Sequence, residues 1–432
     1  MAKIITNLND IKEDDGIPEV LIDPSTLTYA QLRDEITKMS KKLEADSAHK
    51  LSALQKSRPV FSMGSFGLDC GLGRVDPVYG NGGVPERSIV EIFGPPGVYK
   101  SGTFHHMIRS VQQRGLIVYL ILSEEQNYEH MESLGIDMEA LQIFNCYDPQ
   151  HRELKYATAE RRLRDLVRAS MNPLVGMVGI DTIKGMSGMG QVFDGKGVTT
   201  ASDRPFDKSD TAIRANFMEK FFNRIKLFNK RAIVGLVNQT NESITEKYVL
   251  GPELKGYTSG GRRKEFEAVI RINVDSRPLY DKDEHDVFDN YHPQIGWEVQ
   301  YRILKNKFSS RAGARRLTSK FYFDGTGFDD VDQVVRYGAY LGMIRHSGAY
   351  YYFKSKKKDK NGKAIEKSCQ GLDQAKEFLK AHPLLLAAMK KRILLRTPEL
   401  FSHRSKEKVR NGLATAKVIN ARIGEGSEEE AA

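Results

Sequence analysis

Nine residues constrain the fold of this chain more than any other stretch. They read GPPGVYKSG, Gly94 to Gly102, and lie between a β-prone run at residues 88–93 and a helical pattern that ends at Gly115. A glycine-rich turn between a strand and a helix is the context of a phosphate-binding loop, in which backbone N–H groups, a lysine and a hydroxyl hold phosphates and Mg²⁺. The residues expected to bind a nucleotide here are Gly94, Pro95, Pro96, Gly97, Val98, Tyr99, Lys100, Ser101 and Gly102.

Tyr99 departs from this loop pattern, which has glycine before the lysine. If the backbone needed a positive φ at this position, a tyrosine would cost about 1–3 kcal/mol. We therefore expect slightly different loop dihedral angles, and an effect on the rate of hydrolysis without a change in the kind of chemistry.

Strand-like and helix-like segments alternate after the loop. Strands are predicted at residues 116–122, 174–180 and 231–238, and helices at 157–170 and 210–228. This alternation favours an α/β fold with a mostly parallel, twisted sheet flanked by helices.

The later part of the chain predicts closer-spaced strands and then helix. The segments EAVIRINV, EVQYRILKNK and KFYFDG are expected to extend the sheet in antiparallel fashion, and a charged surface loop, KSKKKDKNGK, precedes a helical section at 371–396. The predicted organisation is a small helical N-terminal element at 1–58, an ATPase-like core at 59–327, a small α/β C-terminal domain at 328–420 and an acidic, disordered tail at 421–432.

The composition limits the classes of partner and compartment. The chain has 66 Lys and Arg against 56 Asp and Glu, a formal charge of +10, which suits a polyanionic partner but does not identify one. No apolar stretch approaches the roughly 18 residues of a membrane span, and the N-terminus lacks the apolar core of a secretory signal. Three cysteines without CxxC spacing fit a reducing compartment. We expect a cytoplasmic protein with no membrane partner.

Two carboxylates follow predicted strands and complete the candidate site. Asp181 comes after the apolar run LVGMVGI and would orient the metal together with Ser101, or would cap the next segment. Glu124 comes after the strand at 116–122 and would orient the attacking water, with Glu125 as the competing choice.

Other polar and aromatic residues are weaker candidates. Gln239 ends the run AIVGLVNQ and could sense the γ-phosphate, while Tyr128 could stack on adenine or pack as an ordinary tyrosine. His105 and His106 are adjacent on a predicted helix and would diverge, and no Cys/His cluster has metal-ligand spacing. We therefore expect no structural metal.

Two long connections are candidate DNA-binding loops, at about 184–208 and 240–259. Such lengths are usually functional or disordered, and a mobile surface loop is the alternative. Methionines could enter among bases, tyrosines could stack on them, and cations could contact phosphates, also at the helix start after 259. The candidates are Lys184, Met186, Met189, Lys196, Arg204, Lys247, Tyr248, Lys255, Tyr257, Gly260, Gly261, Arg262 and Arg263.

Several of these motifs together resemble the RecA recombinases. The stretches GSFGLDCGLG and GGVPERSIVEIFGPPGVYKS are followed in order by LSEE, GIDT, VNQ, TSGGRRKEFEAVIRI and LKNK, and then by GAYYYFK and GLDQAKEFLKAHP. The likeness runs over roughly residues 61–396. The aromatic residue before the lysine is similar to that in phage recombinases of the UvsX type.

The resemblance implies a DNA-dependent ATPase that forms a helical filament on single-stranded DNA, with ATP and Mg²⁺ between neighbouring subunits. It implies pairing with homologous double-stranded DNA and strand exchange in recombination and repair, with residues 1–58 serving oligomerisation. A loading mediator and a single-strand-binding protein are further expected partners. Lys100 and Ser101 would bind phosphates and Mg²⁺, Asp181 the metal's water shell and Glu124 the attacking water, and Gln239 would report the γ-phosphate to the second loop.

Lys305 and Lys307 lie two residues apart on a predicted strand and would therefore project to one face. In the family this pair reaches the neighbour's ATP, so both belong to the expected catalytic set. The alternative is a solvated basic edge strand.

Two other functions remain open at this point. A hexameric replicative helicase shares the core but would use an arginine finger from a neighbouring subunit. A filament that coats DNA without hydrolysing ATP would fit a phosphate loop altered by Tyr99.

Overall fold

The computed structural model describes residues 58–76, 78–145, 158–187, 209–241, 257–281, 292–308, 315–358 and 364–397. The expected N-terminal helical element and the acidic tail lie outside these ranges, as do most of the two expected DNA loops.

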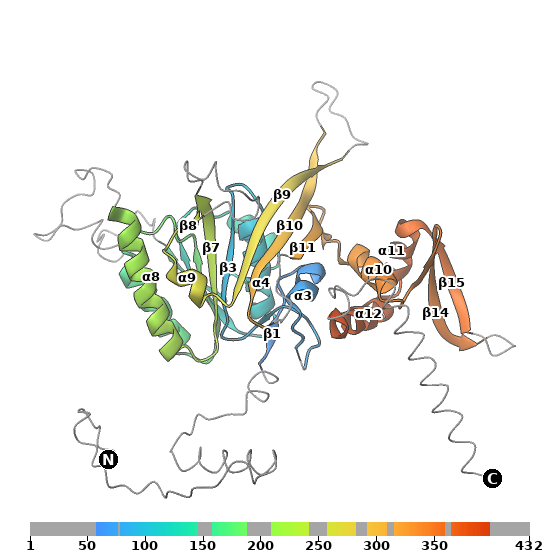
Figure 1. The fold of residues 1–432 in the computed structure, drawn as a ribbon, viewed down its shortest axis with the longest axis horizontal. Coiled ribbons are helices and arrows are strands. Elements are labelled where there is room, and N and C mark those ends of the chain that lie inside the picture. Colours follow the sequence, from blue (N-terminus) through green and yellow to red (C-terminus); the bar gives the residue numbers. More distant parts are fainter. Residues whose placement is uncertain are drawn as a thin grey trace, which may run out of the picture. The chain divides into compact units, whose positions relative to one another are not determined.

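The described residues form a ten-stranded sheet with the order β12-β11-β10-β9-β3-β7-β6-β4-β5, and with β8 paired to β7 (Figure 1). Its strands are β3 (Ile89–Gly94), β4 (Ile117–Leu122), β5 (Leu141–Asn145), β6 (Val175–Asp181), β7 (Ile233–Asn241), β8 (Tyr257–Thr258), β9 (Ile270–Tyr280), β10 (Gln294–Asn306), β11 (Arg315–Tyr322) and β12 (Gly327–Phe328). Neighbouring strands from β9 through β3 to β5 are parallel, which confirms the mostly parallel α/β fold.

One expected strand orientation is wrong. The segment EAVIRINV was expected to begin an antiparallel extension, but β9 runs parallel to β3, with Val90 opposite Ile270 and Ile92 opposite Ile272. The antiparallel part begins only at β10, which pairs with β9 and β11. The physical reason is that the chain between β7 and β9 returns to the starting edge of the sheet before it enters β9.

Helices cover both faces of the sheet. On one face, α4 (Lys100–Gln112), α5 (Tyr128–Ser133) and α3 (Phe66–Leu72) contribute apolar side chains to one buried cluster. On the other, α6 (Ala159–Ser170) and α8 (Ser209–Phe228) pack over β6 and β7 in a second cluster. This arrangement follows from the parallel strands, whose two faces both need cover.

Helix α4 approaches the sheet closely because two glycines make room for one aromatic ring. A Cβ at Gly179 of β6 or at Gly235 of β7 would lie 2.5 Å from the ring of Phe104. Phe104 is fully buried. The small residues on the two central strands therefore set the depth of the helix whose first turn carries Lys100 and Ser101.

The end of the chain has a core of its own. It contains α10 (Asp330–Tyr340), β13 (Arg345–Ser347), β14 (Tyr350–Lys358), β15 (Ala364–Gln370), α11 (Gly371–Lys380) and α12 (Pro383–Leu395). Their apolar side chains form one cluster, which Phe66 and Cys70 of α3 also join. The division into a core at 59–327 and a C-terminal domain at 328–420 stays a prediction.

The expected helical section at 371–396 consists of two helices, because Pro383 cannot continue α11 and instead occupies the first turn of α12. One other expectation for this region needs correction. The predicted charged loop KSKKKDKNGK is strand as far as Lys358, since it continues β14 opposite β15. Its residues 359–363 lie outside the described residues.

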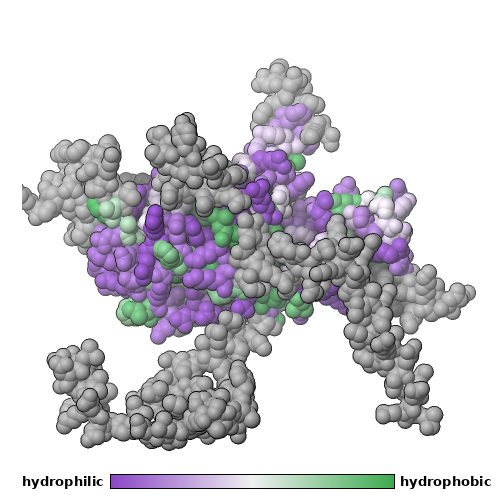
Figure 2. Space-filling model, in the orientation of Figure 1, coloured by the Kyte–Doolittle hydropathy of each residue, from purple (hydrophilic) through white to green (hydrophobic). Residues whose placement is uncertain are grey.

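The remaining elements are small. Strands β1 (Val60–Phe61) and β2 (Val84–Pro85) form a separate two-stranded sheet, and α9 (Arg263–Glu267) precedes β9. In the view of Figure 2, the described surface over α8 and the adjoining part of the sheet is mainly hydrophilic. None of the helices in the described ranges has the length and apolar character needed to cross a membrane.

Candidate nucleotide site

The loop between β3 and α4 has the geometry of an anion cradle. Gly97 has a φ of 76° and nothing within 4 Å of the place where a Cβ would be, so glycine is needed here for its backbone conformation. The side chain of Lys100 donates a hydrogen bond to the carbonyl oxygen of Pro95. Burial lowers the pKa of Lys100, while the carboxylates of Asp181 and Glu124 act in the opposite direction.

The Tyr99 side chain forms part of the wall of this loop, and its backbone is not in the left-handed region. Its φ is −66°, so the penalty considered for a positive φ does not arise. Its buried ring lies 4.8 Å from the ring of Phe321, and its hydroxyl lies 3.3 Å from Nε2 of His106. A Cβ at Gly102 would lie 2.3 Å from the tyrosine ring, so the glycine two residues after Lys100 makes room for the aromatic residue before it.

Asp181 ends β6 and is fully buried beside the loop. Its Oδ2 accepts a hydrogen bond from Nε2 of Gln126 at 3.3 Å, and its Oδ1 has no partner. Burial raises the pKa of this carboxyl to about 6. A buried carboxylate with an unpaired oxygen near Lys100 fits a divalent cation, because a cation would compensate its lost solvation.

Glu124, Gln239 and Thr182 are brought together by the sheet. Oε1 of Glu124 accepts hydrogen bonds from Oγ1 of Thr182 at 2.9 Å and from Nε2 of Gln239 at 3.0 Å. Oε1 of Gln239 accepts a bond from Nζ of Lys184 at 3.4 Å. The competing residue, Glu125, is exposed and does not line the cavity described next, so the geometry favours Glu124.

Glu124, Gln239 and Thr182 line a cavity of about 570 Å³. Its lining includes Lys100, Ser101, Glu124 and Gln239 from the predicted set. Tyr128, the predicted adenine partner, is 43% exposed and is not among the lining residues. The lining residues that the sequence did not reveal are His105, Gln126, Asn127, His130, Thr182, Trp297 and Phe323. No local sequence pattern marks any of these residues, although Asn127 and His130 lie within six residues of Glu124 in the sequence.

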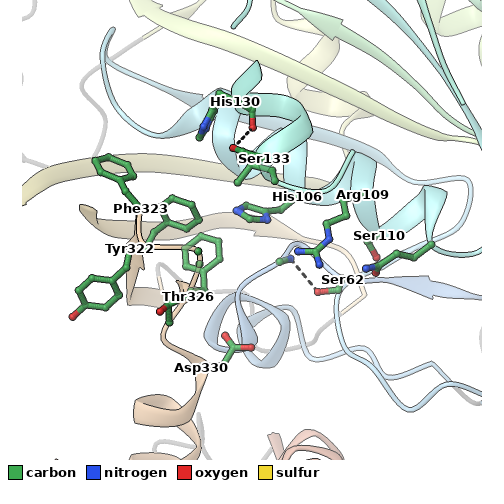
Figure 3. Close-up of a pocket in the computed structure, with 17 residues that line it drawn as sticks. Ser62, His106, Arg109, Ser110, His130, Ser133, Tyr322, Phe323, Thr326 and Asp330 are labelled. Atoms are coloured by element: carbon green, nitrogen blue, oxygen red, sulfur yellow. Dashed lines mark hydrogen bonds between the residues drawn. The ribbon is translucent and has the colours of Figure 1, made fainter. Parts of the chain in front are cut away.

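A second cavity of about 640 Å³ adjoins the first and shares His130 and Phe323 with it. Figure 3 shows His130 of α5, His106 of α4 and the aromatic residues Tyr322 and Phe323 around it. His105 and His106 line different cavities, because side chains at adjacent positions of a helix point in different directions. Burial lowers the pKa of His105 to about 4 and that of His106 to about 3, so both are neutral at pH 7. Within the described ranges, no group of three His, Cys, Asp or Glu side chains could hold a metal ion by itself.

Lys305 and Lys307 converge on the end of α9 and do not line their own chain's nucleotide cavity. Nζ of Lys305 donates to the carbonyl oxygen of Phe266 at 3.0 Å and also to that of Glu265. Nζ of Lys307 lies 3.5 Å from the carbonyl oxygen of Phe266. The two ammonium groups thus lie close together, although β10 ends at Asn306 and Lys307 lies just beyond it. Their catalytic role stays a prediction.

The start of the first loop is described only to residue 187. Lys184 is exposed, but Met186 is 1% exposed and packs in the cluster under α6 and α8. The expectation that Met186 enters among DNA bases is therefore wrong for this structure, because the side chain is already buried against its own chain. Met189, Lys196 and Arg204 lie outside the described residues.

The second loop is described at its two ends. Backbone pairing joins Asn241 of β7 to Tyr257 of β8, and Gly260 and Gly261 have φ values of 98° and 76° before α9 begins. Arg262 and Arg263 are exposed at that helix start, and Arg263 pairs with Glu267 at 2.8 Å. Lys247, Tyr248 and Lys255 lie outside the described residues.

A strand, a phosphate-binding loop, a helix and a buried carboxylate at the end of a nearby parallel strand, here β6 with β7 between it and β3, define the class of P-loop nucleotide-binding proteins. The RecA N-terminal domain family matches residues 30–316, and the chain belongs to the RecA family.

Several bacterial RecA proteins are similar to this chain at low sequence identity. RecA of Lactococcus lactis subsp. cremoris is 26% identical over 326 residues, which cover 75% of this chain and 72% of that protein. RecA of Corynebacterium urealyticum is 24% identical over 323 residues, covering 74% and 75%. RecA of Salinispora arenicola is 25% identical over 338 residues, covering 78% and 82%.

Proposed function

We propose that this chain is an ATP-dependent recombinase that forms a filament on single-stranded DNA and exchanges strands with a homologous duplex. The observation that carries the proposal is the hydrogen bond of 3.0 Å between Gln239 and Glu124. It places a carboxylate that can orient water next to a residue at the root of the second loop. Nucleotide state and loop state can then influence each other through one side-chain contact.

The chemistry proposed for the site is phosphoryl transfer to water. Lys100 and the loop N–H groups would bind the phosphates, and Ser101 and Asp181 would hold Mg²⁺, which would neutralise charge on the phosphates. Glu124 orients the attacking water and accepts its proton. Gln239 exchanges its bond to Glu124 for one to the γ-phosphate. Lys305 and Lys307 are proposed to serve the nucleotide of the adjacent subunit, since they lie away from their own.

The cavity lining suggests a different base contact from the one read in the sequence. His130 and Phe323 line both cavities and therefore lie where the two adjoin. We propose that they, rather than Tyr128, contact the adenine.

The phage-type assignment remains part of this proposal and rests on Tyr99. Because the φ of Tyr99 is negative, the positive-φ penalty gives no reason to expect a loop unable to support hydrolysis. A filament that only coats DNA therefore loses its motivation.

The deciding experiment is strand exchange between a circular single strand and a homologous linear duplex, with ATP and Mg²⁺. We expect joint molecules with the wild-type chain and none with Lys100→Ala. Unwinding of a forked duplex together with rings in electron micrographs would favour the helicase. DNA binding without strand exchange or DNA-stimulated phosphate release would favour a coating filament.

A second experiment addresses the lysine pair. Lys305→Ala with Lys307→Ala should abolish DNA-stimulated ATP hydrolysis while ATP binding by the isolated protomer persists. Mixing this variant with Lys100→Ala provides the control, because a site shared between subunits can be rebuilt from one intact half of each. Unchanged hydrolysis in the double variant would refute the role of the pair.

A further inference from the structure

A buried carboxylate lies in the strand that leads into the phosphate loop. Glu91 of β3 is fully buried, three residues before Gly94. Its Oε2 accepts a hydrogen bond from Nε of Arg271 at 2.6 Å. Its Oε1 accepts bonds from Oγ1 of Thr258 at 2.9 Å and from Nδ2 of Asn238 at 3.2 Å. Both oxygens are therefore satisfied, by side chains from three other elements.

One of these partners belongs to the closing end of the second loop. Thr258 is the last residue of β8, and it is 7% exposed, so its hydroxyl faces the protein interior rather than a ligand. The buried ammonium group of Lys264 holds the same turn, donating to the carbonyl oxygens of Thr258 at 2.8 Å and Gly261 at 3.1 Å. Burial lowers the pKa of Lys264, and the nearby Glu91 acts against this effect.

Asn238 provides a second bridge, which ends at the proposed γ-phosphate sensor. Its Nδ2 also donates to the carbonyl oxygen of Ser259 at 2.8 Å, and its Oδ1 accepts the backbone N–H of Gln239 at 3.0 Å. Glu91, Asn238 and the turn at 258–261 thus form one connected set of hydrogen bonds. This set joins the strand before the phosphate loop, the residue before Gln239 and the end of the second loop.

Fold stability alone is a poor explanation for this set of buried charges. Burying ions is costly, and an apolar replacement of similar volume is often as stable. Charged, fully hydrogen-bonded groups instead hold their partners in one geometry. Here that geometry relates the loop end to Gln239.

We propose that Glu91, acting together with Asn238, is a positioning residue that fixes the closing end of the second loop relative to Gln239 and the phosphate loop. The inference rests on the proposed function, because it concerns the response of ATP hydrolysis to DNA. Without this anchor, the loop end moves independently of the γ-phosphate sensor, and DNA stimulates hydrolysis only at higher concentration.

The first test uses Glu91→Gln in the full chain, with oligodeoxythymidine as the DNA. We expect the DNA concentration for half-maximal stimulation to rise by about fivefold or more, as expected for the loss of a charge-assisted hydrogen bond. Binding of a fluorescent ATP analogue without DNA should keep its affinity, since Glu91 does not line the nucleotide cavity. A folded Glu91→Gln variant with the wild-type DNA response would overturn the proposal.

A second set of variants decides the question if Glu91→Gln fails to fold. Thr258→Val removes only the hydroxyl that Glu91 accepts, and Thr258→Ser keeps it. We expect Thr258→Val to need more DNA, and Thr258→Ser to restore the wild-type value. Thr397→Val is the matched control, because it removes a buried threonine hydroxyl that donates to Leu394 at 3.0 Å, far from the network in sequence and in a different core.

These experiments distinguish failure of the positioning role from failure of the proposed function. Equal DNA responses of Thr258→Val, Thr258→Ser and wild type would refute the positioning role while leaving the proposed function intact. A wild-type chain whose hydrolysis does not respond to DNA would refute the proposed function and the inference with it.

Discussion

Gly102 and Tyr99 provide a quantitative test of how the phosphate loop is packed. In Gly102→Ala the new methyl carbon would lie 2.3, 2.4 and 2.6 Å from three carbons of the Tyr99 ring. Contacts this short force the ring or the helix to move, and overpacking of this kind costs about 1–3 kcal/mol. The same substitution also replaces a helical glycine by alanine, which contributes about 1 kcal/mol of stabilisation where space allows.

A double-mutant cycle separates these two effects. In a Tyr99→Gly background the ring is absent, so Gly102→Ala should become neutral or stabilising by up to about 1 kcal/mol. The helix-propensity gain is the same in both backgrounds and cancels, so the interaction free energy between the two sites should equal the overpacking cost of about 1–3 kcal/mol. Tyr99→Phe is the matched control, because it keeps the ring and loses only the 3.3 Å contact of the hydroxyl with His106.

The assay is equilibrium unfolding in urea for the four members of the cycle and for Gly102→Ala in the Tyr99→Phe background. We expect Gly102→Ala to destabilise the wild-type and Tyr99→Phe chains and not the Tyr99→Gly chain. An equal change in the free energy of unfolding in all three backgrounds would show that the ring does not occupy this space.

Three further predictions concern charge and ligand binding. Asp181→Asn should raise stability at pH 7 without Mg²⁺ or ATP by up to about 3 kcal/mol, because burial raises the pKa of Asp181 to about 6 and the charged form is disfavoured above it. This gain in stability should shrink as the pH falls from 6 toward 4, because the wild-type carboxyl becomes protonated in the folded state. Urea unfolding at a series of pH values measures the gain. As a control, Asp76→Asn should lower stability, since the Asp76 carboxylate accepts a hydrogen bond from Arg114 at 3.0 Å. His130→Ala should weaken binding of a fluorescent ATP analogue by about tenfold and Tyr128→Ala should not; the opposite order would reinstate Tyr128. If each protomer neutralises roughly three to five phosphates, log affinity for oligodeoxythymidine should fall with log salt with a slope of about −2 to −3.5, and a slope near zero would exclude a phosphate-based contact.

Local sequence predicted those parts of the site that depend on adjacent residues. The loop from Gly94 to Gly102 and the carboxylate at Asp181 follow directly from a strand and its turn, and their places in the structure agree with that reading. Strand alternation predicted the parallel sheet for the same reason. These features need no knowledge of distant contacts.

The features of the site that the sequence did not predict depend on contacts between segments distant in sequence. Phe323 and Trp297 reach the cavity from the antiparallel part of the sheet, more than 150 residues after the phosphate loop, and no motif marks them. The glycine-rich segment around Met186 predicts a side chain that contacts DNA bases, but Met186 packs in the apolar cluster under α6 and α8. Glu91 is one polar residue within the β-prone run 88–93, and its hydrogen bonds go to residues of β7, β8 and β9 that are distant in sequence.

The packing of the Phe104 ring against Gly179 and Gly235 limits how the sequences of related proteins can diverge. A side chain added at Gly179 would meet both Phe104 and Leu120, and one added at Gly235 would meet Phe104, Met177 and Met107. Unless these neighbours also change, the first turn of α4 is pushed outward and the lysine with it. Substitutions at either glycine are therefore expected to occur together with changes at position 104 and at these neighbours across relatives.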